Sequence, residues 1–158
     1  MPGKKEKQFL FSVQLNCREK EMSVLTVKNT PHHIKVTTPI EFDGQGNEWS
    51  PEQLFLASIS SCFVSTYLFF AKSEKLEGIE LECEIIGQVE MINEKYRFTN
   101  INLFPKIMIA SESLREKANK VLEKTHQHCL VAQSVNAFIF YHSEVLIGAT
   151  KKKRAVVH

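Results

Sequence analysis

The sequence predicts an α+β protein in which β-strands surround a long, central apolar helix. Residues 54–71 carry no charge, and a helix that is apolar on nearly all sides is usually buried at the centre of a fold. The segments on either side contain short runs that alternate between apolar and polar side chains, a period that is typical of strands. With 158 residues, 43% of them apolar, the chain is long enough for one domain with a core.

We therefore expect a single domain over residues 1–158, with an ordered core from about residue 9 to residue 147 and a basic tail over residues 148–158. The net charge of +2 gives no electrostatic reason to expect nucleic acid or an anionic membrane as a partner. The first residues, MPGKKEK, are polar, and no apolar core of a signal peptide follows them. These features favour a cytoplasmic protein whose four cysteines are thiols.

The apolar run at residues 54–71 also has to be weighed as a membrane span. Its 18 residues only just reach the length that a bilayer requires. The run contains five hydroxyl side chains, which lower its hydrophobicity: Ser58, Ser60, Ser61, Ser65 and Thr66. The rest of the chain consists of amphipathic segments that need a core partner, so a buried helix is favoured over a membrane span.

Three strands are expected before the helix, at residues 9–15, 22–27 and 33–38. The first alternates, with Phe9, Phe11, Val13 and Leu15 on one face. The second and third are separated by a turn at residues 28–31 that ends in proline. A loop with two glycines follows at residues 42–47, and such a loop can bring its backbone close to a neighbouring group.

The start of the helix is marked by several independent signals. Ser50 is an expected N-cap, Pro51 fits the first helical position, and Glu52 complements the positive end of the helix dipole. Gln53 completes a capping box with Ser50. We expect the helix to run to residue 74 or 75, with Gly78 just beyond its end.

The second half of the chain contains strands, two helices and a final strand. Strands are expected at residues 79–91 and 96–109, and Pro105 suggests an edge or a bulge in the second. Ser111 is the expected cap of a helix, a short helix should follow at about residues 129–135, and residues 138–147 form a closing strand. The expected order is β-β-β-α-β-β-α-α-β.

Cys62 lies about three turns into the apolar helix. Free cysteine is often a small buried hydrophobe, and this structural interpretation applies to any cysteine on such a helix. The hydroxyl side chains around Cys62 are unusual for a purely structural helix and favour a reactive thiol instead.

Cys129 follows His126, Gln127 and His128 and is expected to open the short helix. The backbone N–H groups and the positive dipole of a helix start favour a thiolate, as does a nearby imidazolium. A buried helix-end cysteine is the alternative. A metal site from His126, His128, Cys129 and Cys62 is a third possibility, although H-x-H-C lacks a zinc-binding spacing. We interpret Cys17 and Cys83 as structural.

Two motifs together resemble the OsmC/Ohr family of thiol-dependent hydroperoxide reductases. The first is Ser50-Pro51-Glu52-Gln53-Leu54 with Cys62 ten residues after Glu52, behind a glycine-containing loop. The second is the segment HQHCLV that contains Cys129. The order of strands and helices also fits, so the resemblance spans residues 9 to about 147. The residue after the second cysteine is Leu130, where many relatives carry proline.

The resemblance implies antiparallel sheets wrapped around the central helix and an intertwined homodimer with two active sites at the subunit interface. It implies that Cys62 attacks an organic or inorganic hydroperoxide as a thiolate, and that Cys129 resolves the sulfenic acid as a disulfide, which an external dithiol reduces. Glu52 would orient the family's catalytic arginine. Arg18, the only arginine before Glu52, is the candidate. No metal or organic cofactor is implied, and the role would be antioxidant and peroxiredoxin-like, in the oxidative stress response.

Two other functions remain open from the sequence. The first is a non-catalytic OsmC-like dimer that binds an apolar small molecule, suggested by the aromatic side chains of the helix: Phe55, Phe63, Tyr67, Phe69 and Phe70. The second is a redox or metal sensor that acts through His126, His128 and Cys129. Trp49 either packs onto the first helical turn or forms the wall of a substrate pocket.

Overall fold

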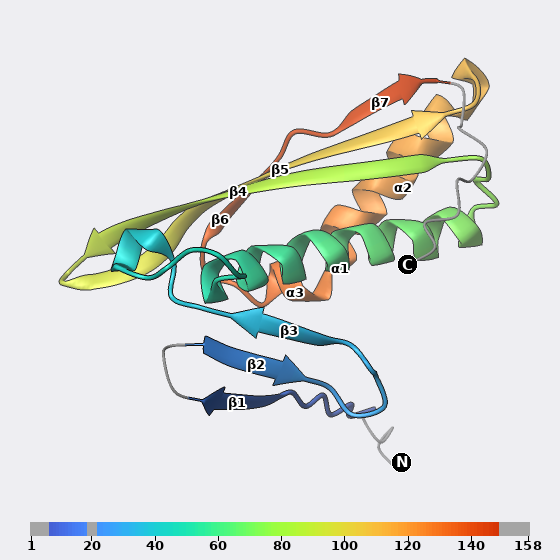
Figure 1. Ribbon diagram of the computed structural model, residues 1–158. Helices are drawn as coiled ribbons and strands as arrows, with labels where there is room; N and C mark the ends of the chain where they lie inside the picture. The colour runs from blue at the N-terminus through green and yellow to red at the C-terminus, as the bar shows by residue number, and fades with distance from the viewer. Residues whose placement is uncertain (1–6, 19–21, 149–158) are drawn as a thin grey trace, which may run out of the picture. The chain divides into compact units, whose positions relative to one another are not determined.

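The computed structural model describes residues 7–18 and 22–148. Most of the basic tail expected at residues 148–158 therefore lies outside the described residues. The chain divides into two compact units, Met1–Leu54 and Phe55–His158. In order along the chain, the elements are β1, β2, β3, η1, α1, β4, β5, η2, α2, α3, β6 and β7 (Figure 1).

The first unit contains a three-stranded antiparallel sheet of β1 (Gln14–Arg18), β2 (Met22–Thr26) and β3 (His33–Val36), in that order. The first strand was expected at residues 9–15, but it begins only at Gln14. Gln14 pairs with Thr26, and beyond Thr26 the partner strand ends in a turn closed by a bond from Thr30 N to Val27 O. Residues before Gln14 therefore have no partner on β2.

The glycine-containing loop makes the close approach that the sequence suggested. It follows the short helix η1 (Ile40–Phe42). A Cβ atom on Gly44 would lie 1.8 Å from the Thr38 carbonyl oxygen, and Gly46 has a φ of +63°. Only glycine fits both positions without strain.

The predicted capping box at the start of α1 (Pro51–Ser73) is confirmed. Gln53 N donates to Ser50 Oγ at 3.1 Å, and Ser50 N donates to Gln53 Oε1 at 3.0 Å. The end of the helix differs from the expectation. Lys75, with a φ of 52°, is the left-handed residue, and Leu76 N closes the turn onto Ala71 O at 2.8 Å. Gly78 lies further on and does not cap the helix.

The second unit is built on a mixed sheet. β4 (Glu80–Ile92) and β5 (Lys95–Ile109) pair antiparallel, with a bulge between Gln88 and Val89. The single closing strand expected at residues 138–147 is in fact two strands, β6 (Phe138–Tyr141) and β7 (Glu144–Ile147), and both pair parallel with β5. The expectation of purely antiparallel sheets is therefore wrong for this unit.

Pro105 explains where the closing strand breaks. β6 pairs with β5 residues 100–103 and β7 with residues 106–109, so Pro105 lies between the two partners. Proline has no N–H to donate to a neighbouring strand. The prediction of an edge or a bulge at Pro105 is wrong, because β5 is an interior strand and the bulge is at Gln88. Pro105 nevertheless marks the point where the hydrogen-bond ladder between β5 and its parallel partners is interrupted.

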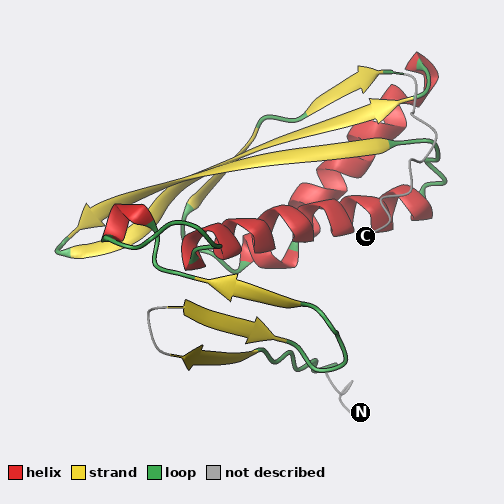
Figure 2. Ribbon diagram, in the orientation of Figure 1, coloured by secondary structure: helices red, strands yellow, loops and turns green. Residues whose placement is uncertain are grey.

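The helices of this unit lie on one side of the sheet (Figure 2). The helix expected after Ser111 begins with a 3₁₀ turn, η2 (Glu112–Leu114), and continues as α2 (Arg115–His128). Ser111 makes no capping bond, since its hydroxyl pairs with Ser113 Oγ at 2.8 Å. The short helix α3 (Leu130–Gln133) follows.

The core of this unit forms where one face of α1 meets the sheet and α2. The buried residues of α1 recur every four positions, which is the spacing of one helix face. They pack with alternate residues of β5 and with one face of α2. The cluster includes Ile59, Phe63, Tyr67, Ala71, Ile101, Leu103, Ile107, Ile109, Ala118, Val121 and Leu122.

Tyr67 has a fully buried phenol, and its hydroxyl has no hydrogen-bond partner among the described residues. Burial raises the pKa of Tyr67 to about 12. Because an unpaired buried hydroxyl is destabilising, we expect Tyr67→Phe to raise the free energy of unfolding by about 1 kcal/mol in urea denaturation. A loss of stability would mean that the hydroxyl has a partner, which would contradict this account.

Candidate functional site

Cys62 and Cys129 lie together in the second unit, although they are far apart in the sequence. Both belong to the packing around the core, where Cys129 is fully buried and Cys62 is partly buried. The backbone N–H of Val131, two residues after Cys129, donates a hydrogen bond to Cys62 Sγ at 3.5 Å. The first turn of α3 therefore holds the two thiols next to each other.

The break between α2 and α3 produces this arrangement. Cys129 has an extended backbone, with φ −68° and ψ 101°. It is both the C-cap residue of α2 and the N-cap residue of α3. Its N–H donates to Thr125 O at 3.0 Å, and its carbonyl accepts from Gln133 N at 3.1 Å. Because the chain changes direction at Cys129, the N–H groups of the first turn of α3 face α1, and that of Val131 reaches Cys62 Sγ.

The Cys129 thiol is harder to ionise than the sequence suggested. The pKa of Cys129 is raised to about 11, chiefly by burial and also by the neighbouring Cys62, although hydrogen bonds from the backbone at Ala132 and Val131 oppose the rise. The helix start expected to favour a thiolate is present, but α3 has only four residues and burial outweighs it.

The hydroxyl side chains near Cys62 do not act as its donors. Ser58, Ser60 and Ser61 each donate to a backbone carbonyl three residues earlier in α1, at 2.6, 3.2 and 3.2 Å. The hydrogen-bonding capacity of these hydroxyls is therefore used within the helix, as is common for serine. The hydrogen bond recorded at Cys62 Sγ in the described part of the chain comes from the Val131 N–H instead.

An aromatic cluster stands beside the two thiols. Tyr141 of β6 stacks on His126 at 4.1 Å between ring centroids and on Phe63 at 5.7 Å. Burial raises the pKa of Tyr141, and charges on Cys129 and Cys62 raise it further. No sequence motif marks Tyr141, whose only signal is its place on the inner face of an alternating strand.

The two histidines of the HQHC segment point in different directions. His126 packs inward on Phe63 and Tyr141, and burial lowers its pKa, although the charge of Glu123 opposes this. His128 is exposed, its ring against Phe70 and its Nδ1 2.9 Å from Lys124 O. Within residues 7–18 and 22–148, no three His, Cys, Asp or Glu side chains gather closely enough to hold a metal ion. The suggested metal site from His126, His128, Cys129 and Cys62 therefore has no ligand set there.

Cys83 and Cys17 lie elsewhere. Cys83 is on β4 against the core, where burial raises its pKa to about 11. This environment fits the structural role expected for it. Cys17 is on β1 and exposed, in the first unit.

Glu52 and Arg18 belong to the first unit. One carboxylate oxygen of Glu52, Oε2, is buried and has no hydrogen-bond donor among the described residues. A buried carboxylate oxygen without a donor is costly. The backbone of Arg18 pairs with Met22 at the end of β1, and its side chain lies outside the described part of the structure.

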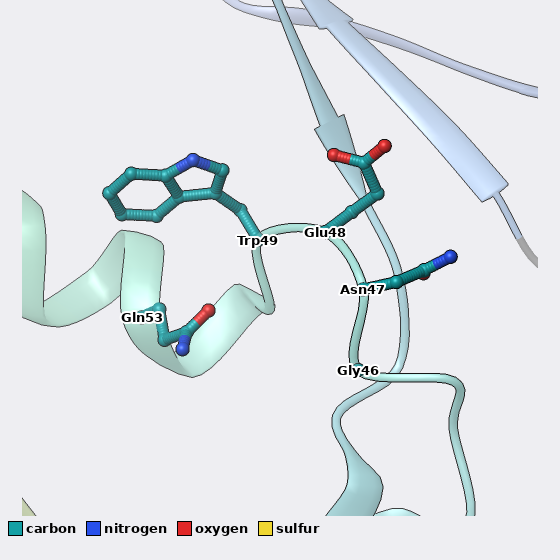
Figure 3. A pocket seen from close by; sticks show the side chains of 5 residues that line it. All are labelled: Gly46, Asn47, Glu48, Trp49 and Gln53. Carbon is teal, nitrogen blue, oxygen red and sulfur yellow. The ribbon is translucent and has the colours of Figure 1, made fainter.

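Trp49 lines a pocket of about 420 Å³ with Gly46, Asn47, Glu48 and Gln53. The indole ring of Trp49 and the amide of Gln53 lie on one side of the loop, and the side chains of Glu48 and Asn47 extend on the other (Figure 3). Glu48 Oε1 forms an ion pair with Lys35 Nζ at 3.7 Å. Trp49 also ties the loop to β3, because its carbonyl accepts from Thr37 N at 2.9 Å. The polar groups of this pocket do not converge on one point.

Comparison with known proteins identifies the class of this fold. The family described as OsmC-like protein matches residues 44–140, more than half of the chain. Organic hydroperoxide resistance protein-like 2 of Staphylococcus epidermidis is 32% identical over 96 residues, which are 60% of this chain and 66% of that protein. YmaD of Bacillus subtilis is 20% identical over 128 residues, which are 79% of this chain and 85% of YmaD.

Solved structures show the same fold. The organic hydroperoxide resistance protein OsmC of Legionella pneumophila superposes with a TM-score of 0.68 at 18% identity, covering 88% of this chain and 99% of that one. OhrB of Bacillus subtilis gives a TM-score of 0.60 at 19% identity, covering 85% of this chain and 98% of OhrB. The chain belongs to the OsmC-like protein family, and the resemblance drawn from its two cysteine motifs is confirmed at that level.

Family membership also settles the nature of α1. Among the described residues there is one helix, α1, whose length and apolar composition would allow it to cross a membrane. In this chain it is the core helix of an OsmC-like fold, with Ile59, Phe63, Tyr67 and Ala71 buried against the sheet and α2.

The high pKa of Cys129 can be measured directly. In protein labelled with ¹³C at the cysteine Cβ atoms, we expect the Cys129 resonance to titrate near pH 11, above the usual thiol value of 9.0. In Cys62→Ser the midpoint should fall but stay above that value, because burial is the largest cause of the shift. A midpoint at or below the usual value would contradict the buried environment described here.

Proposed function

We propose that this protein is a cysteine-based peroxidase that reduces organic or inorganic hydroperoxides. Cys62 is the attacking thiolate and Cys129 the resolving thiol. The observation that carries the proposal is the Val131 N–H bonded to Cys62 Sγ at 3.5 Å, beside a fully buried second thiol. The Staphylococcus, Legionella and Bacillus relatives named for organic hydroperoxide resistance support the choice of substrate.

The reaction takes two steps. The Cys62 thiolate attacks one peroxide oxygen, an S–O bond forms and the O–O bond breaks, and the alkoxide leaves and takes up a proton as the alcohol. Cys129 then attacks the sulfur of the Cys62 sulfenic acid, a disulfide forms, and the oxygen leaves as water. An external dithiol reduces the disulfide to two thiols. The second thiol prevents irreversible oxidation of Cys62 to the sulfinic acid.

Hydrogen-bond donors would stabilise the thiolate of Cys62. The Val131 N–H is one such donor. A guanidinium would be a stronger one, and we propose Arg18 for it, oriented by Glu52. The buried Oε2 of Glu52, which lacks a donor among the described residues, supports this role because a guanidinium would satisfy it.

The working form is proposed to be a homodimer in the cytoplasm, with a dithiol as reductant. Only 22% of an apolar 18-residue stretch of α1 is buried within the chain. Leu68 and Phe69 are 49% and 68% exposed on that helix. A partner subunit that covers this face would remove a contiguous apolar surface from water.

A non-catalytic function in binding an apolar small molecule also has an observation in its favour. Phe55 stacks on Phe98 at 4.8 Å beside a pocket of about 410 Å³, which Val135, Ala137 and Arg97 also line. A ligand retained in native mass spectra, together with thiols that do not react with peroxide, would favour this alternative over the peroxidase.

The roles of the two cysteines predict different phenotypes for their serine variants. Cys62→Ser should lose at least about 100-fold in the rate of alkyl hydroperoxide consumption with dithiothreitol, since the nucleophile is absent. Cys129→Ser should still form a sulfenic acid and then accumulate sulfinic acid at Cys62, because nothing resolves it.

Stopped-flow kinetics and intact-protein mass spectrometry give both readouts. Cys83→Ala is the matched control, a partly buried thiol outside the site, and it should keep the wild-type rate within about twofold. A wild-type rate no higher than that of free cysteine would rule out the peroxidase.

The dimer can be tested at the exposed face of α1. We expect sedimentation equilibrium to give a dimer for the wild type and a monomer for Phe69→Glu, because a carboxylate cannot be buried unpaired in an apolar interface. Asn119→Glu, which places the same charge on the exposed face of α2, should leave the dimer intact. If Phe69→Glu associates as tightly as the wild type, this face is not the interface.

A further inference from the structure

A pocket lies at one edge of β5 in the second unit. β6 begins at Phe138, which pairs with Asn100, so among the described strands none continues along that edge beside the first residues of β5. Residues 134–137, which join α3 to β6, line a pocket of about 410 Å³ there together with Phe55, Arg97 and Phe98. This volume falls within the range of about 300–1,000 Å³ that is typical of small-molecule sites.

Two stacked aromatic rings form the apolar part of the pocket. Phe55 of α1 stacks on Phe98 of β5, with 4.8 Å between ring centroids and 29° between the ring planes. Gly87 of β4 allows Phe98 to lie close against the sheet, because a Cβ atom there would be 2.6 Å from Phe98 Cε1 and 2.7 Å from Leu56 Cδ2. Both rings are only half-buried, so a packed and partly exposed aromatic surface is available to the ring of a ligand.

The polar part of the pocket carries a positive charge. Arg97 belongs to the lining, and the lining contains no acidic residue. Glu90 is the partner of Arg97 in the β4–β5 register, yet no ion pair of Arg97 is found within residues 7–18 and 22–148. Ser134 already donates its hydroxyl to Leu130 O at 2.9 Å. Asn136 is exposed beside Arg97 in the lining and adds a second side chain with N–H donors.

We propose that this pocket binds a small aromatic carboxylate. The ring of the ligand lies against the Phe55–Phe98 pair, and its carboxylate binds the Arg97 guanidinium, with the Asn136 amide as a further donor. A guanidinium matches a carboxylate in charge and in its two parallel N–H groups. A neutral apolar molecule gains nothing from Arg97, and a cation is repelled by it.

The proposed site is separate from the two thiols. Neither Cys62 nor Cys129 lines the pocket. Phe55 and Cys62 are seven residues apart on α1, which places them on one side of the helix at about 10 Å along its axis. Equilibrium binding of the carboxylate therefore requires neither a thiolate nor a peroxide, and the inference does not depend on the peroxidase function. It assigns a charge to the ligand of this pocket, beyond the apolar molecule considered above.

Three ligands with the same ring test the charge preference: naphthylacetate, its neutral amide naphthylacetamide, and the cation naphthylethylamine. Their affinities are measured by isothermal titration calorimetry with the reduced full chain. We expect the carboxylate to bind at least about tenfold more tightly than the amide, because charge-assisted hydrogen bonds are the stronger ones, and the amine to bind most weakly. Salt at about 0.5 M should weaken binding of the carboxylate and leave that of the amide unchanged within about twofold.

Two matched variants test the role assigned to Arg97. Arg97→Gln should reduce the affinity for naphthylacetate to within about twofold of that for the amide, while the affinity for the amide stays near the wild-type value. Lys106→Gln removes one positive charge from an exposed position of β5 outside the pocket, and it should keep the wild-type preference. In ¹⁵N NMR spectra of the wild type, naphthylacetate should shift the backbone resonances of Asn136 and Ala137.

The proposal is overturned if the amide binds as tightly as the carboxylate, or if Arg97→Gln keeps the full preference for the carboxylate. It is also overturned if no ligand binds at millimolar concentration, or if the NMR shifts leave residues 134–137 unchanged. Failure of the peroxidase function would appear in a different measurement, the consumption of hydroperoxide, and would not alter any of these binding results.

Discussion

The site depends on one contact, the hydrogen bond from the Val131 backbone N–H to Cys62 Sγ at 3.5 Å. It joins the middle of α1 to the first turn of α3 and thus joins two parts of the chain that carry the two thiols. The contact requires two features of the fold. One face of α1 must be buried against β5 and α2. α2 must also end at His128, closed by the bond from Cys129 N to Thr125 O, so that the following N–H groups turn toward α1.

The same packing that brings the thiols together makes them chemically unequal. Cys129 is fully buried, and its pKa is raised to about 11, so at neutral pH it is a poor nucleophile until a reactive partner is present. Cys62 is partly exposed and receives a backbone donor. This asymmetry suits an attacking thiol that meets the substrate first and a sheltered thiol that reacts only with the oxidised form of its neighbour.

Local signals in the sequence predicted local structure well. The capping box of Ser50 and Gln53 formed as expected, because both partners lie within one helical turn. The strand pairs and the apolar helix followed from periodicity. The two cysteine motifs were sufficient to place the chain in the OsmC-like family.

Features that depend on distant parts of the chain were not predicted correctly. The parallel pairing of β6 and β7 with β5 cannot be read from the alternation of residues 138–147, which is the same for either direction. α1 ends at Ser73, slightly before the expected residue 74 or 75, and the left-handed residue that follows is Lys75, because the turn closes onto Ala71. The pKa of Cys129 was expected to fall at a helix start, but it rises because tertiary burial has the larger effect. Tyr141 has no motif, and only the assembled fold stacks its ring on His126 and Phe63.

Peptide mapping under non-reducing conditions, after one equivalent of an organic hydroperoxide, identifies the two sulfurs that become joined. We expect a disulfide between the peptides that contain Cys62 and Cys129, formed within each subunit, with Cys83 still a thiol. A stable sulfenic or sulfinic acid at Cys62 with Cys129 unmodified, or a disulfide that joins Cys62 to any other cysteine, would contradict it.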